Sequence, residues 1–296
     1  MVKGFLLLLV TGLVAFGMYT LWQRQPKIQP EKTEQASQLE QKQIIQENLS
    51  PIDGSVIKES EVELKSKGTP KSSFLIYSNT FQNLVKSNDE GTFTSTITLD
   101  TNLNLIKIIE LDQGLQQVSE KTLTYYYAPK SEAQTVSAGP VKSIFDSLIT
   151  LTSTKGELNV RTSKSTEFEI PQIEGQEEAT AQADNIRIGD YIIVLGNSED
   201  SDSLIAQNVE VIRQNKPQIT KKLLLGTIAS SVRQNLFSAK DKDGEIVEFT
   251  LNKNSEIFTN NEVVKNDQVQ KDKKVIILYA SKDNETNTVD TIYLIP

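Results

Sequence analysis

Residues 186–196 read IRIGDYIIVLG, and residues 204–211 read LIAQNVEV. In the first segment an apolar run, Ile192–Leu195, follows a Gly-Asp turn, and in the second segment apolar and polar side chains alternate. Short apolar or alternating runs bounded by turn residues are typical of β-strands. The two segments therefore predict an antiparallel hairpin with one face in a core.

A second copy of this pattern lies nearer the C-terminus, where residues 268–280 read QVQKDKKVIILYA and residues 288–295 read TVDTIYLI. The copies align Ile192–Leu195 with Val275–Leu278, Val209 and Val211 with Ile292 and Leu294, Gly139 with Gly226, and Gly156 with Gly244. Self-similarity of this kind predicts tandem domains. We assign them to residues 139–215 and 222–296, with a hinge at Pro217 between them.

Each copy contains about five strands, which are too few for a sandwich and fit a small closed barrel of the OB type. Residues 51–138 form a more divergent β-domain. As a third copy it would have hairpins at Gly68 and within residues 92–111; otherwise residues 112–138 form an inserted strand or a bridge. The predicted fold class is all-β, with tandem small OB-like antiparallel barrels after an N-terminal transmembrane helix and a polar linker.

The N-terminal segment, residues 1–24, has the features of a membrane anchor. Residues 4–22 carry no charge and lie between Lys3 and Arg24. This is about the length that a helix needs to cross a bilayer, and Tyr19 and Trp22 stand where interfacial aromatic residues occur. We expect residues 4–22 to contact the lipid bilayer, with the C-terminal part outside the cytoplasm. A signal peptide cleaved near Gly17 is the alternative, and it would release a secreted soluble protein.

Residues 25–50 are rich in Gln, Glu and Lys and contain neither Gly nor an aromatic residue. This composition predicts a polar linker that acts as a solvated stalk. A short coiled coil is the alternative, because a thin apolar stripe runs through the segment.

The composition excludes several kinds of chemistry. The chain contains no His and no Cys, which removes thiol nucleophiles, disulfides, Ser-His-Asp triads and the common zinc and haem ligands. It has 31 basic and 39 acidic residues, a net charge of −8. Residues 1–27 hold three of the basic residues and no acid, so the remainder carries −11. Such a charge repels nucleic acid at long range, and we expect no nucleic-acid partner.

Clusters of acidic residues recur in the predicted hairpins: Asp100, then Glu199, Asp200 and Asp202, then Asp283 and Glu285. Carboxylates in a flexible loop are calcium ligands, but Asp also favours turns because its side chain bonds to nearby backbone. Residues 241–244, DKDG, have the same two interpretations. We assign no metal, cofactor-binding or catalytic residue.

Two basic runs and one aromatic run complete the candidates. The basic runs are Lys221–Lys222 and Lys271–Lys274, and the aromatic run is Tyr125–Tyr127. A basic groove with stacked aromatic rings is how OB-type barrels bind single-stranded nucleic acid. The negative charge and the predicted export argue against that use, and the tyrosines are better explained as a strand with alternate rings buried.

The repeat resembles an uncharacterised family of small β-barrel domains that occur in tandem in exported bacterial cell-envelope proteins. The matching features are the Gly-x-Val/Ile openings at Gly139 and Gly226, the hairpin STKGELNV at residues 153–160, and IRIGDYIIVLG with LIAQNVEV. The resemblance covers residues 139–213 and 222–295; in the second copy Lys271–Lys273 replaces Ile188–Asp190. It implies OB-like barrels and an envelope location, and it carries no catalytic residues.

These observations lead us to expect a single-pass membrane protein whose extracytoplasmic β-domains have a structural or binding role, without catalysis. The expected partner is another envelope protein or a polysaccharide. The alternative from a different class is a hydrolase that acts on cell-wall glycans through two carboxylates.

Overall fold

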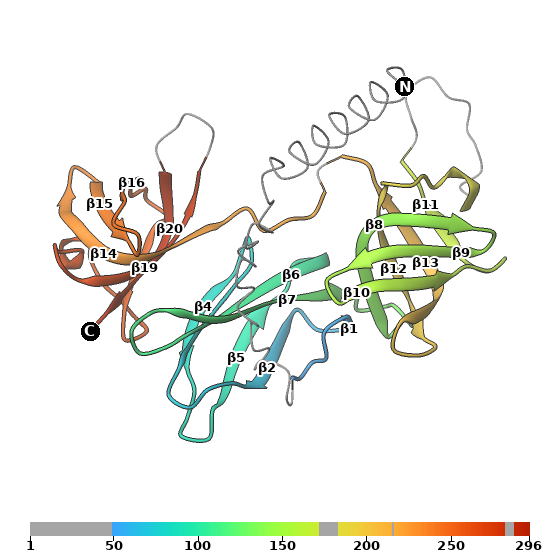
Figure 1. The fold of residues 1–296 in the computed structure, drawn as a ribbon, viewed down its shortest axis with the longest axis horizontal. Coiled ribbons are helices and arrows are strands. Elements are labelled where there is room, and N and C mark those ends of the chain that lie inside the picture. Colours follow the sequence, from blue (N-terminus) through green and yellow to red (C-terminus); the bar gives the residue numbers. More distant parts are fainter. Residues whose placement is uncertain (1–48, 172–182, 215, 282–286) are drawn as a thin grey trace, which may run out of the picture. The chain divides into compact units, whose positions relative to one another are not determined.

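The strands of the chain are short and mostly antiparallel, and they confirm the predicted all-β fold (Figure 1). The computed structural model describes residues 49–296 except residues 172–182, 215 and 282–286. The described residues form strands β1–β20 and two 3-10 helices, η1 (Ala183–Asn185) and η2 (Asn266–Gln268). We divide them into a first module (residues 49–127), a middle barrel (β8–β13) and a last barrel (β14–β20).

The predicted anchor and nearly all of the predicted linker lie outside the described residues. Leu49 and Ser50, at the end of that linker, already belong to the first module, since Leu49 packs against its core and Ser50 pairs with Lys65. Within the described part of the chain, no helix has the length and apolar character that a membrane crossing requires.

The last barrel is a closed ring of five strands. Its strands are β14 (Lys222–Arg233), β15 (Leu236–Asp241), β16 (Ile246–Thr250), β17 (Glu256–Thr259), β18 (Glu262–Val263), β19 (Lys274–Ala280) and β20 (Asn287–Ile295). Strand β14 pairs with β15 and β19, β15 pairs with β16, and β20 pairs with β19 and, in parallel, with β16. The ring β14-β15-β16-β20-β19 closes on itself, and β17 adds to β20 in parallel. Closure gives each of the five strands a partner on both sides, although the parallel β16–β20 contact is only two residue pairs long.

The middle barrel has the same order of pairing. Its strands are β8 (Thr135–Phe145), β9 (Leu148–Ser153), β10 (Gly156–Arg161), β11 (Glu167–Glu169), β12 (Tyr191–Ser198) and β13 (Ser203–Ile212). The ring runs β8-β9-β10-β13-β12 and returns to β8, with a parallel pair at β10–β13. Strand β11 adds to β13 in parallel, as β17 adds to β20. Each ring encloses its own cluster of buried apolar side chains.

The register of the strands agrees with the correspondence predicted from the repeat. Ile192 lies opposite Gly139 and Val211, and Val275 lies opposite Gly226 and Leu294. In both barrels the pairing of the last two strands shifts at one place, between residues 195 and 196 in the middle barrel and between residues 278 and 279 in the last. Even this irregularity therefore falls at equivalent positions.

The turn before the fourth ring strand keeps its geometry although its sequence changes from Ile-Gly-Asp to Lys-Asp-Lys. Gly189 has φ 89° and Asp272 has φ 70°. The amide of Gly189 donates to the carbonyl of Val141 (2.9 Å), and the amide of Asp272 donates to that of Ile228 (2.8 Å). Asp tolerates this left-handed conformation better than most residues because its short polar side chain bonds locally.

The two hairpin glycines, by contrast, occupy different places. Gly156 (φ 117°) begins β10 and pairs with Ser153, which leaves a two-residue loop. Gly244 (φ 90°) lies inside a longer loop, because the amide of Asp241 donates to the carbonyl of Glu245. The predicted alignment of these glycines is therefore wrong by one residue.

The first module does not reproduce the ring. Its strands are β1 (Ser55–Ile57), β2 (Glu61–Lys67), β3 (Ser73–Tyr77), β4 (Gln82–Lys86), β5 (Thr92–Thr98), β6 (Asn102–Leu111) and β7 (Gln117–Tyr127). Strand β2 pairs with β5 instead of forming a hairpin after Gly68, and β5 does not pair with β6 as expected for residues 92–111. Strands β4, β3, β6 and β7 form a second layer, which continues through β1 to β8.

Burial explains this arrangement. Strand β3 is buried on both faces, with Phe74 and Ile76 in one cluster and Leu75 and Tyr77 in another. The backbone N–H and C=O groups of a strand buried on both faces cannot reach water, so both of its edges need hydrogen-bonding partners. Strands β4 and β6 pair with the two edges of β3. The half-exposed β2–β5 pair then covers one face, where the rings of Phe74 and Phe93 stack with centroids 4.0 Å apart.

The first module also contacts the last barrel. One apolar cluster combines Leu75, Tyr77 and Leu115 with Ile276 and Tyr293. Residues just after Pro217 bond to the first module as well, since the side chain of Asn79 accepts from the amide of Thr220 (2.8 Å) and donates to the carbonyl of Gln218 (2.8 Å). The predicted hinge therefore leads into a segment that is bonded to the first module.

Candidate functional site

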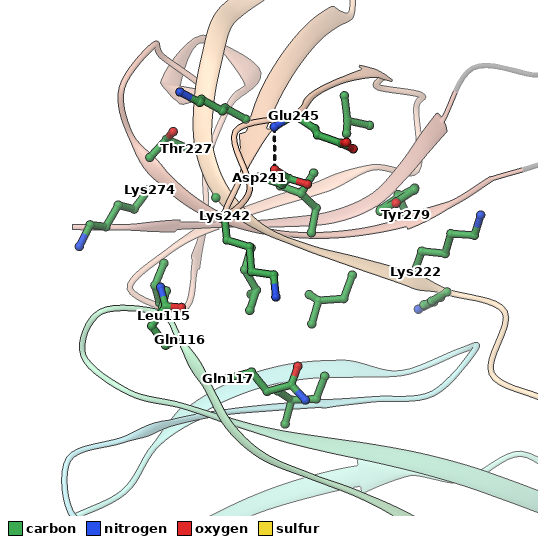
Figure 2. A pocket seen from close by; sticks show the side chains of 18 of the residues that line it. Leu115, Gln116, Gln117, Lys222, Thr227, Asp241, Lys242, Glu245, Lys274 and Tyr279 are labelled. Atoms are coloured by element: carbon green, nitrogen blue, oxygen red, sulfur yellow. Dashed lines mark hydrogen bonds between the residues drawn. The ribbon is translucent and has the colours of Figure 1, made fainter. Parts of the chain in front are cut away.

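A cleft of about 850 Å³ lies between the β6–β7 turn of the first module and strands β14, β15, β16 and β19 of the last barrel (Figure 2). This volume is within the range of ligand-binding pockets. Its lining includes the six lysines Lys107, Lys221, Lys222, Lys240, Lys242 and Lys274 and the three acids Glu120, Asp241 and Glu245. We call it the lysine cleft.

On the first module, the wall is a tight turn held by one carboxylate. Asp112 Oδ1 accepts from the amides of Gly114 (2.7 Å) and Gln116 (2.8 Å). Leu115 has φ 64°, an uncommon conformation for a residue with a branched apolar side chain, and it is buried in the cluster shared with the last barrel. The turn thus inserts an apolar side chain at the contact and leaves Gln116 and Gln117 exposed beside it (Figure 2).

On the last barrel, the wall includes the hairpin between β15 and β16. Asp241 Oδ1 accepts from the amides of Asp243 (2.9 Å) and Glu245 (2.8 Å), which fixes the loop that carries Lys242. Figure 2 shows Lys274, Lys242 and Lys222 following one another across this wall, opposite Leu115 and Gln117.

The lysines differ in their partners. Lys107 pairs with Glu120 at 2.7 Å. Lys221 is 7% exposed and donates to Asp290 Oδ2 (2.7 Å) and Gln82 Oε1 (2.7 Å), so it ties the barrel to the first module. Among the residues that the structure describes, the amino groups of the remaining four lysines (Lys222, Lys240, Lys242 and Lys274) have no ion pair or hydrogen bond. The cleft therefore holds an excess of uncompensated positive charge.

The two aromatic residues of the cleft, Tyr77 and Tyr279, are both at least partly covered by protein. Tyr77 is buried, and burial raises the pKa of its phenol far above the usual value. Burial also raises the pKa of Tyr279, whose ring meets Phe249 edge-on with centroids 5.1 Å apart. Both phenols stay protonated at neutral pH, so neither supplies a nucleophile.

Both residues of the first basic run, Lys221 and Lys222, and only Lys274 of the second run line this cleft. Lys222 lies opposite Tyr279, and Lys274 lies opposite Thr227, along the same pair of strands. Lys240 and Lys242 were not singled out from the sequence, because charges in a strand and a turn are typical of any solvated surface. The position of Lys242 within the DKDG turn, residues 241–244, is the sequence feature that could have drawn attention to this hairpin.

The other predicted candidates lie elsewhere or have structural roles. Asp100 Oδ2 accepts from Thr80 Oγ1 (2.6 Å), and Glu199 pairs with Arg161 (2.9 Å). Hydrogen bonds from Ser203 and Asp202 lower the pKa of Asp200. Asp283 and Glu285 are outside the described residues. Across the described residues no group of three or more acids could hold a metal ion.

The tyrosine run lies at the end of β7, away from the cleft. Tyr125 is fully buried, and its hydroxyl donates to the carbonyl of Pro51 (2.8 Å). Tyr126 and Tyr127 are half-buried. The predicted strand is confirmed, but of the alternate rings Tyr125 and Tyr127 only Tyr125 is fully buried.

One pair of carboxylates was missed by the sequence reasoning. Glu169 of β11 and Glu210 of β13 lie directly opposite each other. Burial, and secondarily the charge of Glu169, raises the pKa of Glu210. The pair is outside the lysine cleft. It became visible only once the parallel pairing of β11 with β13 was known.

Comparisons of the chain with known protein families, with curated proteins and with solved structures give no match.

Proposed function

We propose that the chain is a membrane-anchored extracytoplasmic protein whose lysine cleft holds a component of the cell envelope, without catalysing a reaction. The observation that carries the proposal is the cleft itself, which has the volume of a ligand site and four lysines without a partner in the described residues. A row of like charges without protein partners among the described residues has no evident structural use, and a bound anionic ligand would neutralise it.

The strand order of the two rings supports the assignment of tandem OB-like barrels. In each ring the first strand pairs with the second and the fourth, and the third pairs in parallel with the fifth. This five-stranded arrangement corresponds to the OB type of barrel. The resemblance of the repeat to a family of envelope proteins also implies barrels of this type.

The location rests on the uncharged residues 4–22 and on the acidic remainder. The test is protease treatment of intact cells that express the full chain, combined with the mass of the mature N-terminus. We expect a full-length membrane protein whose C-terminal part is digested from outside. Cleavage near Gly17 would instead give the secreted form, and complete protection of the C-terminal part would refute export.

The binding role has its own test, which uses the absence of cysteine from the chain. A Gln117→Cys variant of the full-length protein can be labelled at that one position with a bulky maleimide, which fills the cleft. We expect the label to abolish retention of the protein on isolated, lipid-free cell-wall material. The control is the same label on Glu262→Cys, an exposed residue that does not line the cleft. Equal retention of both labelled proteins would refute the role of the cleft.

A second candidate function, a glycan hydrolase, is favoured by one observation. Glu210 has a raised pKa beside a second carboxylate, which is the pattern of a general acid and its partner. Release of sugars from cell-wall glycan that disappears in Glu210→Gln would support this alternative.

A further inference from the structure

We infer that the lysine cleft binds an acidic glycan, a polymer that carries a phosphate or a carboxylate on each repeating unit. This inference rests on the proposed binding function and names the chemistry of the ligand. It depends on the charges of the cleft, their spacing and the character of the other lining residues.

The middle barrel shows what the hairpin lysine does when a partner is present. Lys155 lies in the hairpin between the second and third ring strands, and its amino group donates to the carbonyl of Asp53 in the first module. Next to it, the hydroxyls of Thr154 and Thr124 are 3.3 Å apart. Lys242 lies in the equivalent hairpin of the last barrel and has no partner among the described residues. The amino group of Lys242 is therefore available to donate to an oxygen atom of a ligand.

The acids around the cleft leave its positive charge in excess. Glu120 pairs with Lys107, and the carboxylate of Asp241 already accepts two backbone amides. Glu245 is exposed and has no ion pair within the described chain. With Lys107 paired to Glu120 and Lys221 paired to Asp290, the four remaining lysines and the two remaining acids give a local charge of +2 in a protein of charge −8. The cleft therefore favours anions although the protein as a whole is negatively charged.

The spacing of the lysines favours a chain over a single small anion. Lys222 and the cross-strand partner of Lys274, Thr227, are five residues apart on β14. At roughly 3.4 Å per residue, the backbone positions of Lys222 and Lys274 are about 17 Å apart along the strands. A single phosphate reaches one or two amino groups, whereas a polymer with repeated charges reaches the whole row.

The remaining lining favours a glycan over a nucleic acid. Tyr77 is buried and the half-buried ring of Tyr279 meets Phe249 edge-on, so this lining lacks the row of exposed rings on which single-stranded nucleic acids stack their bases. Gln116, Gln117 and Thr227 offer amides and a hydroxyl that can bond to sugar hydroxyls. The ammonium group of lysine is a compact charge that can bind either a phosphate or a carboxylate, because its three donors impose no fixed geometry.

The test uses full-length protein in nanodiscs of zwitterionic lipid and fluorescently labelled polymers. The probes are polygalacturonate, poly(glycerol phosphate), neutral dextran and single-stranded DNA, with binding followed by anisotropy at several salt concentrations. We expect at least one of the two acidic polymers to bind, and dextran not to bind. Which of the two binds identifies the anionic group. The affinity should fall as salt rises, because counterions are released on binding.

The matched variants are Lys222→Glu with Lys274→Glu in the cleft, and Lys253→Glu with Lys265→Glu on exposed positions of the same barrel. Both change the net charge equally. We expect about tenfold or greater loss of affinity and a shallower salt dependence for the cleft variant only. Lys240→Gln with Lys242→Gln, which adds no acid, should also weaken binding.

Equal losses for the cleft and the control variants would overturn the inference, as would tighter binding of the DNA. If labelled Gln117→Cys loses retention on the cell wall but neither acidic polymer binds, the binding function stands and the acidic glycan is wrong. If the label has no effect on retention, the proposed function itself fails.

Discussion

Gly139 and Gly226 occupy the same position in the two barrels, and at both the neighbouring strand leaves no room for a side chain. A Cβ on Gly139 would lie 1.9 Å from the carbonyl oxygen of Thr152, and one on Gly226 would lie 2.0 Å from that of Lys240. Neither glycine has a positive φ. The requirement is therefore for close approach of two backbones and not for a left-handed turn.

Alanine at either glycine should destabilise its barrel by about 3 kcal/mol, because backbone atoms must move to admit the methyl group. Denaturant unfolding of each single variant measures the loss. Gly114→Ala is the control: its Cβ would meet the side chain of Asp112, with Oδ1 nearest at 3.2 Å, and no backbone atom. A loss as small in Gly139→Ala as in this control would show that the strands can separate without cost.

These glycines also show why the barrels could be predicted and the first module could not. Strand ends, tight turns and close approaches in the barrels depend on residues near one another in the chain, so they leave a pattern that repeats. In the first module, β2 pairs with β5 across two intervening strands. Burial of β3 on both faces also removes the period of two by which strands are recognised.

The conformation shared by Gly189 and Asp272 makes a second prediction. Asp272→Gly should change stability by less than about 0.5 kcal/mol, since the backbone is already left-handed there. Asp272→Val should lose about 1–2 kcal/mol, because a β-branched residue resists positive φ. Gly189→Ala should lose about 1 kcal/mol although its Cβ would have open space around it.

Thermal unfolding of the three variants measures these effects. Equal stabilities for Asp272→Gly and Asp272→Val would show that the turn does not need the left-handed conformation.

Arg213 ties the segment before β12 to the end of β13. Its guanidinium donates to the carbonyl of Asn185 (2.8 Å) and to Asp190 Oδ2 (3.2 Å), and both side chains of the ion pair are largely buried. Arg213→Met should destabilise the middle barrel by about 2 kcal/mol, because the carboxylate of Asp190 loses a charged hydrogen bond. Hydrogen exchange at residues 185–190 should become faster.

The control for this prediction is Arg161→Met, in the same barrel. Arg161 pairs with Glu199 at 2.9 Å on the surface, where an ion pair contributes at most about 1 kcal/mol. Unchanged exchange at residues 185–190 in Arg213→Met would mean that the segment is held by other contacts.

The lysine cleft was only partly predictable. Lys222 and Lys274 stood out as members of basic runs, but nothing in the sequence brings them together except the pairing of β14 with β19. The other wall is the turn around Leu115, which depends on contact between the first module and the last barrel. Local patterns do not record a contact between residues so far apart in the chain.

The opposed carboxylates of Glu169 and Glu210 predict a dependence of stability on pH. Burial, and then the charge of Glu169, raises the pKa of Glu210 in the folded state. The folded protein therefore binds this proton more tightly than the unfolded chain does. Stability from this site is fully present below the unfolded pKa, and it is lost as pH rises through the folded pKa.

Glu210→Gln should remove the loss of stability that ionisation of Glu210 causes as pH rises. The variant and the unchanged protein should have similar stabilities near pH 4, and the variant should become more stable by up to about 1 kcal/mol at neutral pH, because like charges directly opposite each other across strands are destabilising. Urea unfolding at a series of pH values measures the difference. Glu167→Gln, an exposed carboxylate on the same strand as Glu169, serves as the control. A difference that stays constant from pH 4 to 7 would show that Glu210 has the same affinity for its proton in both states.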